Sequence, residues 1–252
     1  MLKKAVNLVL SGGAARGVAH IGVIKALEEF GFEIKAVSGV SAGALVGAFY
    51  CAGYSPEEML KLVLSKEWLS YIRPKIPRMG LFSLDKAGAY LRKRLHVERI
   101  EELKRELWIT ALDIRKGQTM HFNKGELYPL LLGSCALPGI FEPVKYGSYL
   151  LVDGGITNNL PVEPFLERDE LLVCVDVNKT LMEERVGNIF QVLIKSFLLA
   201  VRSNVDKRKE HCHVLIEPEL SSYSVYDLWK AKEIYLAGYS KTLEVMKAYG
   251  AY

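Results

Sequence analysis

The amino-acid sequence predicts an α/β protein with a three-layer α/β/α arrangement around a mostly parallel central sheet. Near the start of the chain, a short apolar run, a glycine-rich turn and an apolar helical pattern follow one another twice, over 5–31 and 33–53. A repeated strand–turn–helix order is typical of folds in which crossover helices join parallel strands. The uninterrupted apolar run at 171–177 agrees with this, because such strands suit a sheet covered on both faces.

Local patterns predict the remaining elements in chain order. Ser55 is a capping residue followed by proline and two acids, which is typical of a helix start. Prolines, aromatic residues and cations are mixed over 68–84, where we expect an irregular loop. Further on we expect helices at 84–95, 126–135, 188–209 and 225–249, a strand pair at 107–114 and 118–122, and strands at 149–152 and 213–216. Because no repeat or linker interrupts the pattern, we expect a single domain over 1–252.

Composition and charge narrow the function classes. Half of the 252 residues are apolar and a quarter are charged, which is an ordinary globular profile. The net charge of +4 is small and scattered, and no basic stripe with interleaved aromatic residues is present, so we expect no nucleic-acid partner. The same mild excess is compatible with an anionic membrane surface.

Cysteine usage and the absence of long apolar runs indicate a cytoplasmic protein. The four cysteines lie far apart without a Cys-x-x-Cys pair, which favours free thiols in a reducing compartment over disulfides or a zinc site. The apolar stretch at 5–10 is too short for a signal peptide and runs into a glycine turn, so we interpret it as a buried strand. No apolar run approaches the ~18 residues of a membrane span. We therefore expect at most peripheral contact with the inner face of a membrane.

The first candidate functional residue is Ser41, in the stretch Gly39-Val-Ser-Ala-Gly43. A serine between two glycines at a strand-to-helix turn is typical of a nucleophile elbow. The strained turn tolerates little bulk nearby, and the helix that follows directs its positive N-terminal end at an oxyanion. The alternative is an ordinary helix entry in which Ser41 is the N-cap.

A second glycine-rich loop, Ser11 to Gly17, offers a partner for this serine. The backbone N–H groups of Gly12, Gly13 and Ala14 could hold an oxyanion, since small side chains leave them accessible. Arg16 could fix the loop or meet an anionic group of the substrate. A phosphate-binding loop is the alternative, but the lysine and Ser/Thr of a P-loop are missing and one Rossmann glycine is absent.

The general base must come from another part of the chain. In a Ser-His-Asp hydrolase of the common α/β type only His211 and His213 would have the right order, and they lie in a charged segment without flanking glycines. Asp153 is the better candidate, because it ends an apolar strand and Gly154 and Gly155 let the backbone bend. A carboxylate is a poor base for an alcohol unless burial raises its pKa. Otherwise Asp153 caps a turn, as many Asp-Gly pairs do.

Together these stretches resemble the patatin-like phospholipases. Ser11–Gly17, Gly39–Gly43 and Asp153–Gly155 occur in that family's order, and 19–22, 136–143 and 158–161 are similar to stretches of its bacterial members. The resemblance covers about the first two-thirds of the chain, and it departs at Ser11 and Ala14, where the family usually has glycine. It implies an α/β fold, Ser41 as nucleophile, Asp153 as the base without histidine, and an oxyanion loop at Gly12, Gly13 and Ala14.

The resulting expectation is a serine hydrolase of lipid-like esters that needs no metal and no cofactor. Its alternatives are an acyltransferase that uses the same acyl-serine and a weakly active lipid-sensing adaptor. The loop at 68–84 is either a lid that contacts lipid or a plain surface loop. The helix at 189–201 is apolar on nearly all sides, so it is core, acyl-pocket wall or dimer face. We interpret His20 and Cys135 as buried and non-catalytic.

Overall fold

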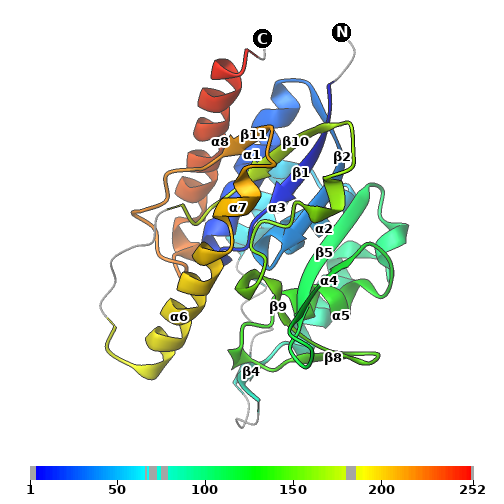
Figure 1. The fold of residues 1–252 in the computed structure, drawn as a ribbon, viewed down its shortest axis with the longest axis vertical. Coiled ribbons are helices and arrows are strands. Elements are labelled where there is room, and N and C mark those ends of the chain that lie inside the picture. The colour runs from blue at the N-terminus through cyan, green and yellow to red at the C-terminus, as the bar shows by residue number, and fades with distance from the viewer. Residues whose placement is uncertain (1–3, 66, 68–72, 75–78, 180–185, 251–252) are drawn as a thin grey trace.

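The computed structural model describes residues 4–65, 67, 73–74, 79–179 and 186–250 and contains a large central sheet (Figure 1). The strand order of this sheet is β11-β10-β1-β2-β5-β9-β8, with β6 paired to β5. In chain order its strands are β1 (Lys4–Leu10), β2 (Phe32–Val40), β5 (Glu106–Asp113), β6 (Gln118–Phe122), β8 (Val144–Tyr146), β9 (Tyr149–Asp153), β10 (Leu171–Val175) and β11 (Val214–Ile216). A second, small sheet has the order β3-β4-β7 and consists of β3 (Arg73–Pro74), β4 (Gly80–Ser83) and β7 (Gly139–Phe141).

The parallel part of the central sheet positions the glycine-rich turns. Strands β11, β10, β1, β2 and β5 run parallel, whereas β6 and β9 both pair antiparallel with β5. The carboxyl ends of β1 and β2 are level, with Leu10 opposite Gly39, so the turns that follow them meet at one edge. Strand β9 reaches the same edge from the other side, with Asp153 opposite Ala111.

Helices surround the central sheet (Figure 1). The helices are α1 (Ala19–Glu29), α2 (Ala42–Ala52), α3 (Pro56–Ser65), α4 (Asp85–Leu95), α5 (Leu127–Ser134), α6 (Ile189–Ser203), α7 (Asp206–Lys209) and α8 (Ala231–Ala248). Short 3₁₀ turns occur at Ala14–Val18, Ile100–Glu102, Gly154–Ile156, Glu163–Phe165 and Leu228–Lys230. The predicted class, a mixed α/β fold with helices around a central sheet, is confirmed.

The alternation of side chains along β1 explains the two cores. Val6 and Leu8 point into the main core, which they share with side chains from α1, α2, α3, α4, α5 and α8. Val9 points to the other face, where it packs with Leu160, Phe165 and Val205. That second layer is thin, since it is built chiefly from the segment after β9 and from the start of α7.

Three expected elements differ in extent. The helix expected over 188–209 is interrupted at Asn204, whose side-chain amide bonds to the carbonyl of Gly155. The closing helix starts only at Ala231, because Ser224 and Asp227 form a turn closed by their own hydrogen bonds. The described part of 68–84 contains β3 and β4, while 68–72 and 75–78 lie outside the described residues, so the predicted lid is largely beyond them.

The prediction of four free thiols is wrong for one pair. Cys174 in β10 and Cys212 form a disulfide, with their Cα atoms 5.8 Å apart. Their separation of 38 residues hides this proximity in the sequence, and the parallel pairing of β10 with β11 creates it. Cys51 and Cys135 are free thiols. The argument for a reducing compartment therefore loses this support.

Among the described residues, none of the helices has both the length and the apolar character that crossing a bilayer requires.

Helices α1 and α8 pack so closely that glycine is required at their contact. A Cβ added at Gly238 would lie 2.1 Å from the carbonyl oxygen of Ala19. We expect Gly238→Ala to lower the free energy of unfolding by about 1–3 kcal/mol through overpacking, although alanine favours a helix by about 1 kcal/mol. Urea denaturation measures the change. Gly88→Ala in α4 is the matched control, because its added Cβ meets only the Leu132 side chain, at 3.3 Å. Equal stability of the two variants would contradict this packing.

Candidate active site

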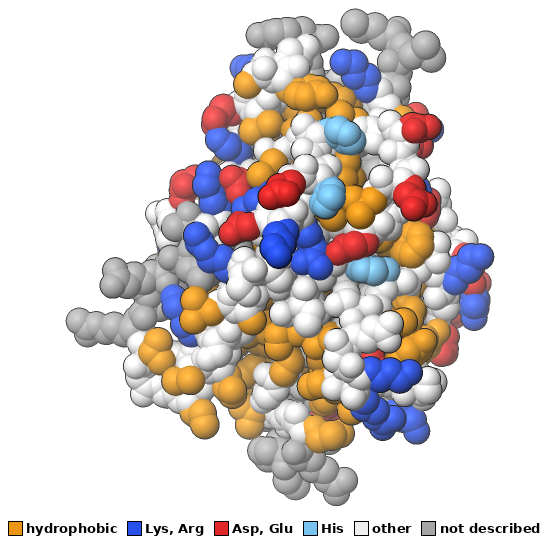
Figure 2. Space-filling model, viewed as in Figure 1, with side chains coloured by type: hydrophobic (Ala, Val, Ile, Leu, Met, Phe, Trp, Pro, Cys, Tyr) orange, Lys and Arg blue, Asp and Glu red, His pale blue; other side chains and the backbone are white. Residues whose placement is uncertain are grey.

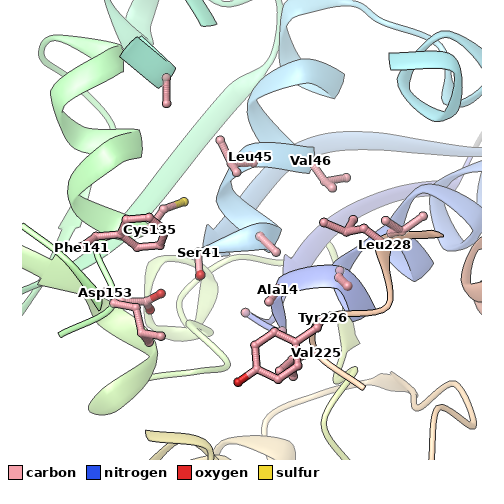
Figure 3. A pocket seen from close by; sticks show the side chains of 18 of the residues that line it. Ala14, Ser41, Leu45, Val46, Cys135, Phe141, Asp153, Val225, Tyr226 and Leu228 are labelled. Atoms are coloured by element: carbon pink, nitrogen blue, oxygen red, sulfur yellow. The ribbon is translucent and has the colours of Figure 1, made fainter. Parts of the chain in front are cut away.

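Ser41 occupies a strained turn between β2 and α2. Its backbone has φ 54° and ψ −124°, a conformation that residues other than glycine rarely adopt. The turn fits only because its neighbours are small: a Cβ at Gly43 would lie 2.3 Å from the carbonyl oxygen of Leu10, and one at Gly39 would lie 2.6 Å from the backbone of Gly43. The turn therefore holds Ser41 in a strained conformation, with its side chain directed into a cavity (Figure 3).

The side chain of Asp153 lies against Ser41. Asp153 is the last residue of β9, and its carboxylate accepts a hydrogen bond of 2.8 Å from the N–H of Gly155. Figure 3 shows the Ser41 hydroxyl and the Asp153 carboxylate pointing toward one another from different elements. Gly154 lets the turn after β9 pass close to β5, since a Cβ there would lie 2.8 Å from the carbonyl oxygen of Thr110.

Burial changes the proton affinity of this carboxylate. Only 2% of Asp153 is exposed, and desolvation raises its pKa to about 7 although hydrogen bonds from Ser41 and Gly155 act to lower it. A pKa near neutrality is suited to a group that takes up and returns a proton at physiological pH. The condition set out from the sequence, that burial must raise the pKa of Asp153, is met.

The loop after β1 presents two of its three expected donors to the cavity. The N–H of Gly12 already donates to Oδ1 of Asn159 at 3.1 Å, which corrects the expectation for this residue. Within the described part of the chain, the N–H groups of Gly13 and Ala14 donate to no other group. Both residues line the cavity beside Ser41. Ala14 has φ 48°, a left-handed conformation that favours glycine over residues with a side chain.

Amide side chains hold this loop in place. The carbonyl of Gly12 accepts a bond of 2.6 Å from Nδ2 of Asn178, so both backbone groups of Gly12 are engaged. Asn159 in turn donates its own N–H to Oδ1 of Asn204 at 2.8 Å. Nδ2 of Asn204 also donates to the carbonyl of Gly155 at 2.9 Å. Asn204 thus connects the end of α6 to the turn after Asp153 directly, and to the loop at Gly12 through Asn159.

Ser134 supports the nucleophile turn from α5. Its hydroxyl oxygen accepts the N–H of Ser41 at 2.8 Å and donates its proton to the carbonyl of Thr110 at 2.7 Å. The backbone of Ser41 is therefore anchored to β5 through one buried hydroxyl. No motif in the sequence points to this residue. Asn159 and Asn178 were detectable in principle, because they follow β9 and β10 at the edge where strand ends carry functional groups.

Most of the other residues considered from the sequence hold the fold together or lie away from the Ser41 hydroxyl. Arg16 is buried, and its Nε donates a hydrogen bond of 2.9 Å to the carbonyl of Tyr223. This bond fastens the loop after β1 to the segment that precedes α8. His20 bonds through Nε2 to the carbonyl of Ser11 at 2.8 Å, and desolvation lowers its pKa to about 4, which keeps it neutral. His213 accepts the N–H of Leu172 at the opposite end of β10 from the cavity. Desolvation raises the pKa of the Cys135 thiol, which is therefore not a thiolate at neutral pH.

Most of the side chains that line the cavity are apolar. Its volume is about 600 Å³, and Ser41, Asp153, Gly13 and Ala14 are among the residues that line it. Leu45 and Phe49 of α2, Leu91 of α4 and Phe197 of α6 are among the apolar side chains that line the rest. No histidine of the described chain lines it. A site of this shape suits a ligand with a long apolar part and one polar, reactive group.

Comparison with known proteins agrees with these features. Residues 8–166 match a protein-family model described as patatin-like phospholipase. An uncharacterized NTE family protein of Mycobacterium tuberculosis is 34% identical over 176 residues, which cover 69% of this chain and 49% of that protein. Lysophospholipase nte1 of Aspergillus fumigatus is 24% identical over 286 residues, which cover 98% of this chain and 19% of that protein. The chain spans about half or less of the length of these relatives.

Among solved structures, VipD from Legionella pneumophila has a similar fold. The TM-score is 0.58 at 17% sequence identity, and the match covers 98% of this chain and 67% of the VipD chain. At this level of identity the likeness concerns the fold alone.

The raised pKa of Asp153 has a consequence for stability. Because the folded-state pKa, about 7, exceeds the unfolded value near 4, the folded state binds the proton more tightly, and the stability from this group is lost as pH rises between these values. Asp153→Asn removes the titration. We expect the stability of the variant relative to wild type to increase by on the order of 2–3 kcal/mol from pH 5 to pH 8. Urea unfolding at both pH values measures this, and a pH-independent difference would contradict the burial of a titrating carboxylate.

Proposed function

This chain belongs to the patatin-like phospholipase family, and on that premise we propose that it hydrolyses lipid-like carboxylic esters through an acyl-enzyme on Ser41. The observation that carries the proposal is the contact between the Ser41 hydroxyl and a buried carboxylate in a largely apolar cavity. A serine hydroxyl needs a neighbouring base and donors for the oxyanion, and both kinds of group adjoin it here.

The proposed reaction has two steps. Asp153 takes the proton of Ser41 as the hydroxyl oxygen attacks the acyl carbonyl, and the N–H groups of Gly13 and Ala14 hold the oxyanion. Asp153 then gives the proton to the leaving alcohol, and the acyl group stays on Ser41 as an ester. In the second step Asp153 takes a proton from water, which attacks the acyl-serine and releases the fatty acid, and Ser41 regains its proton.

The cavity supports an acyl chain as the part of the substrate that is buried. Its walls beyond Ser41 are apolar, so each methylene that enters is removed from water at a gain of about 0.8 kcal/mol. Because Ser41 and Asp153 line this same cavity, an acyl chain bound in it brings its carbonyl carbon within reach of the reacting oxygen. This arrangement favours esters of long or medium acyl chains over acetate esters.

The first test is the nucleophile. Ser41→Ala should lower ester hydrolysis by at least about 10³-fold and abolish labelling by a fluorophosphonate, since it removes the hydroxyl that bonds to Asp153. Cys135→Ala, which alters the same cavity, is the control and should still be labelled. Turnover that persists in purified Ser41→Ala protein would falsify the proposal. A wild-type protein that is neither labelled nor active on any acyl ester would favour a lipid-sensing role.

The second test is the pH dependence of the base. Asp153 acts in its ionised form, so with a pKa of about 7 the value of kcat/KM should fall about tenfold per pH unit below that pH and level off above it. A profile over pH 5 to pH 9 with a soluble ester measures this. A flat profile down to pH 5 would mean that the base has an ordinary carboxylate pKa or is another group.

A further inference from the structure

Helix α6 carries two apolar faces instead of one. Ile194, Phe197, Leu198 and Val201 line the cavity. The outer face, defined here as Ile189, Val192, Leu193 and Leu199, is directed to solvent, with 78%, 48%, 38% and 54% of these residues exposed. A surface helix of a globular protein normally presents one apolar stripe to the core and polar residues to water. Among the described residues, the outer face is therefore an apolar surface that the fold leaves largely exposed.

The position of α6 makes it the wall between the cavity and the surroundings. Ile194 packs with Ile140 of β7 and with Val225 in a small cluster that is separate from the main core. Figure 1 shows α6 in yellow at the lower left, below α7 and beside the sheet rather than in the main helical layer. In Figure 2 hydrophobic side chains gather over this part of the molecule, whereas charged ones gather higher up, around α7. One helix thus separates the catalytic groups from an exposed apolar surface.

The charges on α6 and its flanking residues indicate which kind of partner its outer face can bind. Residues 186–205 include Lys195 and Arg202 and contain no aspartate or glutamate. An apolar helical face with only positive charges complements an anionic phospholipid surface, in which the apolar groups enter the acyl boundary and the cations meet phosphates. A second copy of the chain is less suited, because a two-fold contact of α6 with itself would bring like charges together.

We propose that α6 docks this protein on an anionic phospholipid surface, with Ile189, Val192, Leu193 and Leu199 entering the boundary between head groups and acyl chains. The inference rests on the proposed function, since a hydrolase of lipid esters must take its substrate from such a surface. Docking through the outer face brings the inner face, and the cavity it lines, within reach of acyl chains that leave the lipid layer. It also places the acyl-binding wall and the membrane contact on a single helix.

The test compares matched pairs of exposed apolar residues. Ile189→Gln with Leu199→Gln makes two of the four side chains of the outer face polar, and Leu166→Gln with Leu236→Gln, at residues 46% and 48% exposed elsewhere, is the control. Wild-type protein should sediment with phosphatidylcholine vesicles that contain phosphatidylglycerol. The α6 variant should bind these vesicles at least about tenfold more weakly, since two large side chains no longer leave water, and the control should bind as wild type.

Two further measurements separate this inference from the proposed function. Vesicle binding is repeated in a Ser41→Ala background, where it needs no turnover and should equal that of wild type. A wild-type protein that hydrolyses no ester but still binds through α6 would overturn only the hydrolase. In the active background the α6 variant should keep its rate on a soluble short-chain ester and lose rate on vesicle substrate. Absence of wild-type binding to the vesicles that contain phosphatidylglycerol, or an equal loss in the control, overturns the docking role. So does a dimer in light scattering that the α6 variant dissociates, because the outer face would then bind a second copy.

Discussion

The burial of one carboxylate beside one hydroxyl is the constraint on which the site depends. Transferring Asp153 from water disfavours its charged form, and its surroundings in the described structure return only part of that cost, through Ser41 and Gly155. The same dry setting that destabilises the ionised carboxylate raises its affinity for a proton. In the reaction that we propose, the basicity that a histidine supplies in many serine hydrolases arises from the exclusion of solvent around Asp153.

Close packing and hydrogen bonds hold the backbone on both sides of Ser41 and Asp153 in place. The elbow at Ser41 is strained, and the close packing of Gly43 on Leu10 keeps it so. On the other side, Gly12 is held at both its N–H and its carbonyl, which leaves the next two N–H groups facing the cavity. The donors are thus ordered before a substrate arrives, so less reorganisation is needed when charge develops on the carbonyl oxygen.

The parts that could be predicted from the sequence are those with local causes. The elbow at Ser41 and the Asp153-Gly-Gly turn depend on steric needs that neighbouring residues reveal, and the strand–turn–helix order indicates the parallel sheet. The disulfide between Cys174 and Cys212 could not be predicted, because it follows from which strands pair. Ser134 escaped notice for the same reason. The end of α6 was missed because helical periodicity continues past Asn204, where tertiary hydrogen bonds, and no glycine or proline, stop the helix.

Asn204 couples the C-terminal end of α6 to the loop positions Asn159 and Gly155, so that these segments are ordered together. Its amide oxygen holds Asn159 and its amide nitrogen holds Gly155, so fraying of the last helical turn releases both attachments at once. Local opening in proteins proceeds in such linked units rather than residue by residue. A displacement of the end of α6 therefore acts on the turn after Asp153 through the carbonyl of Gly155.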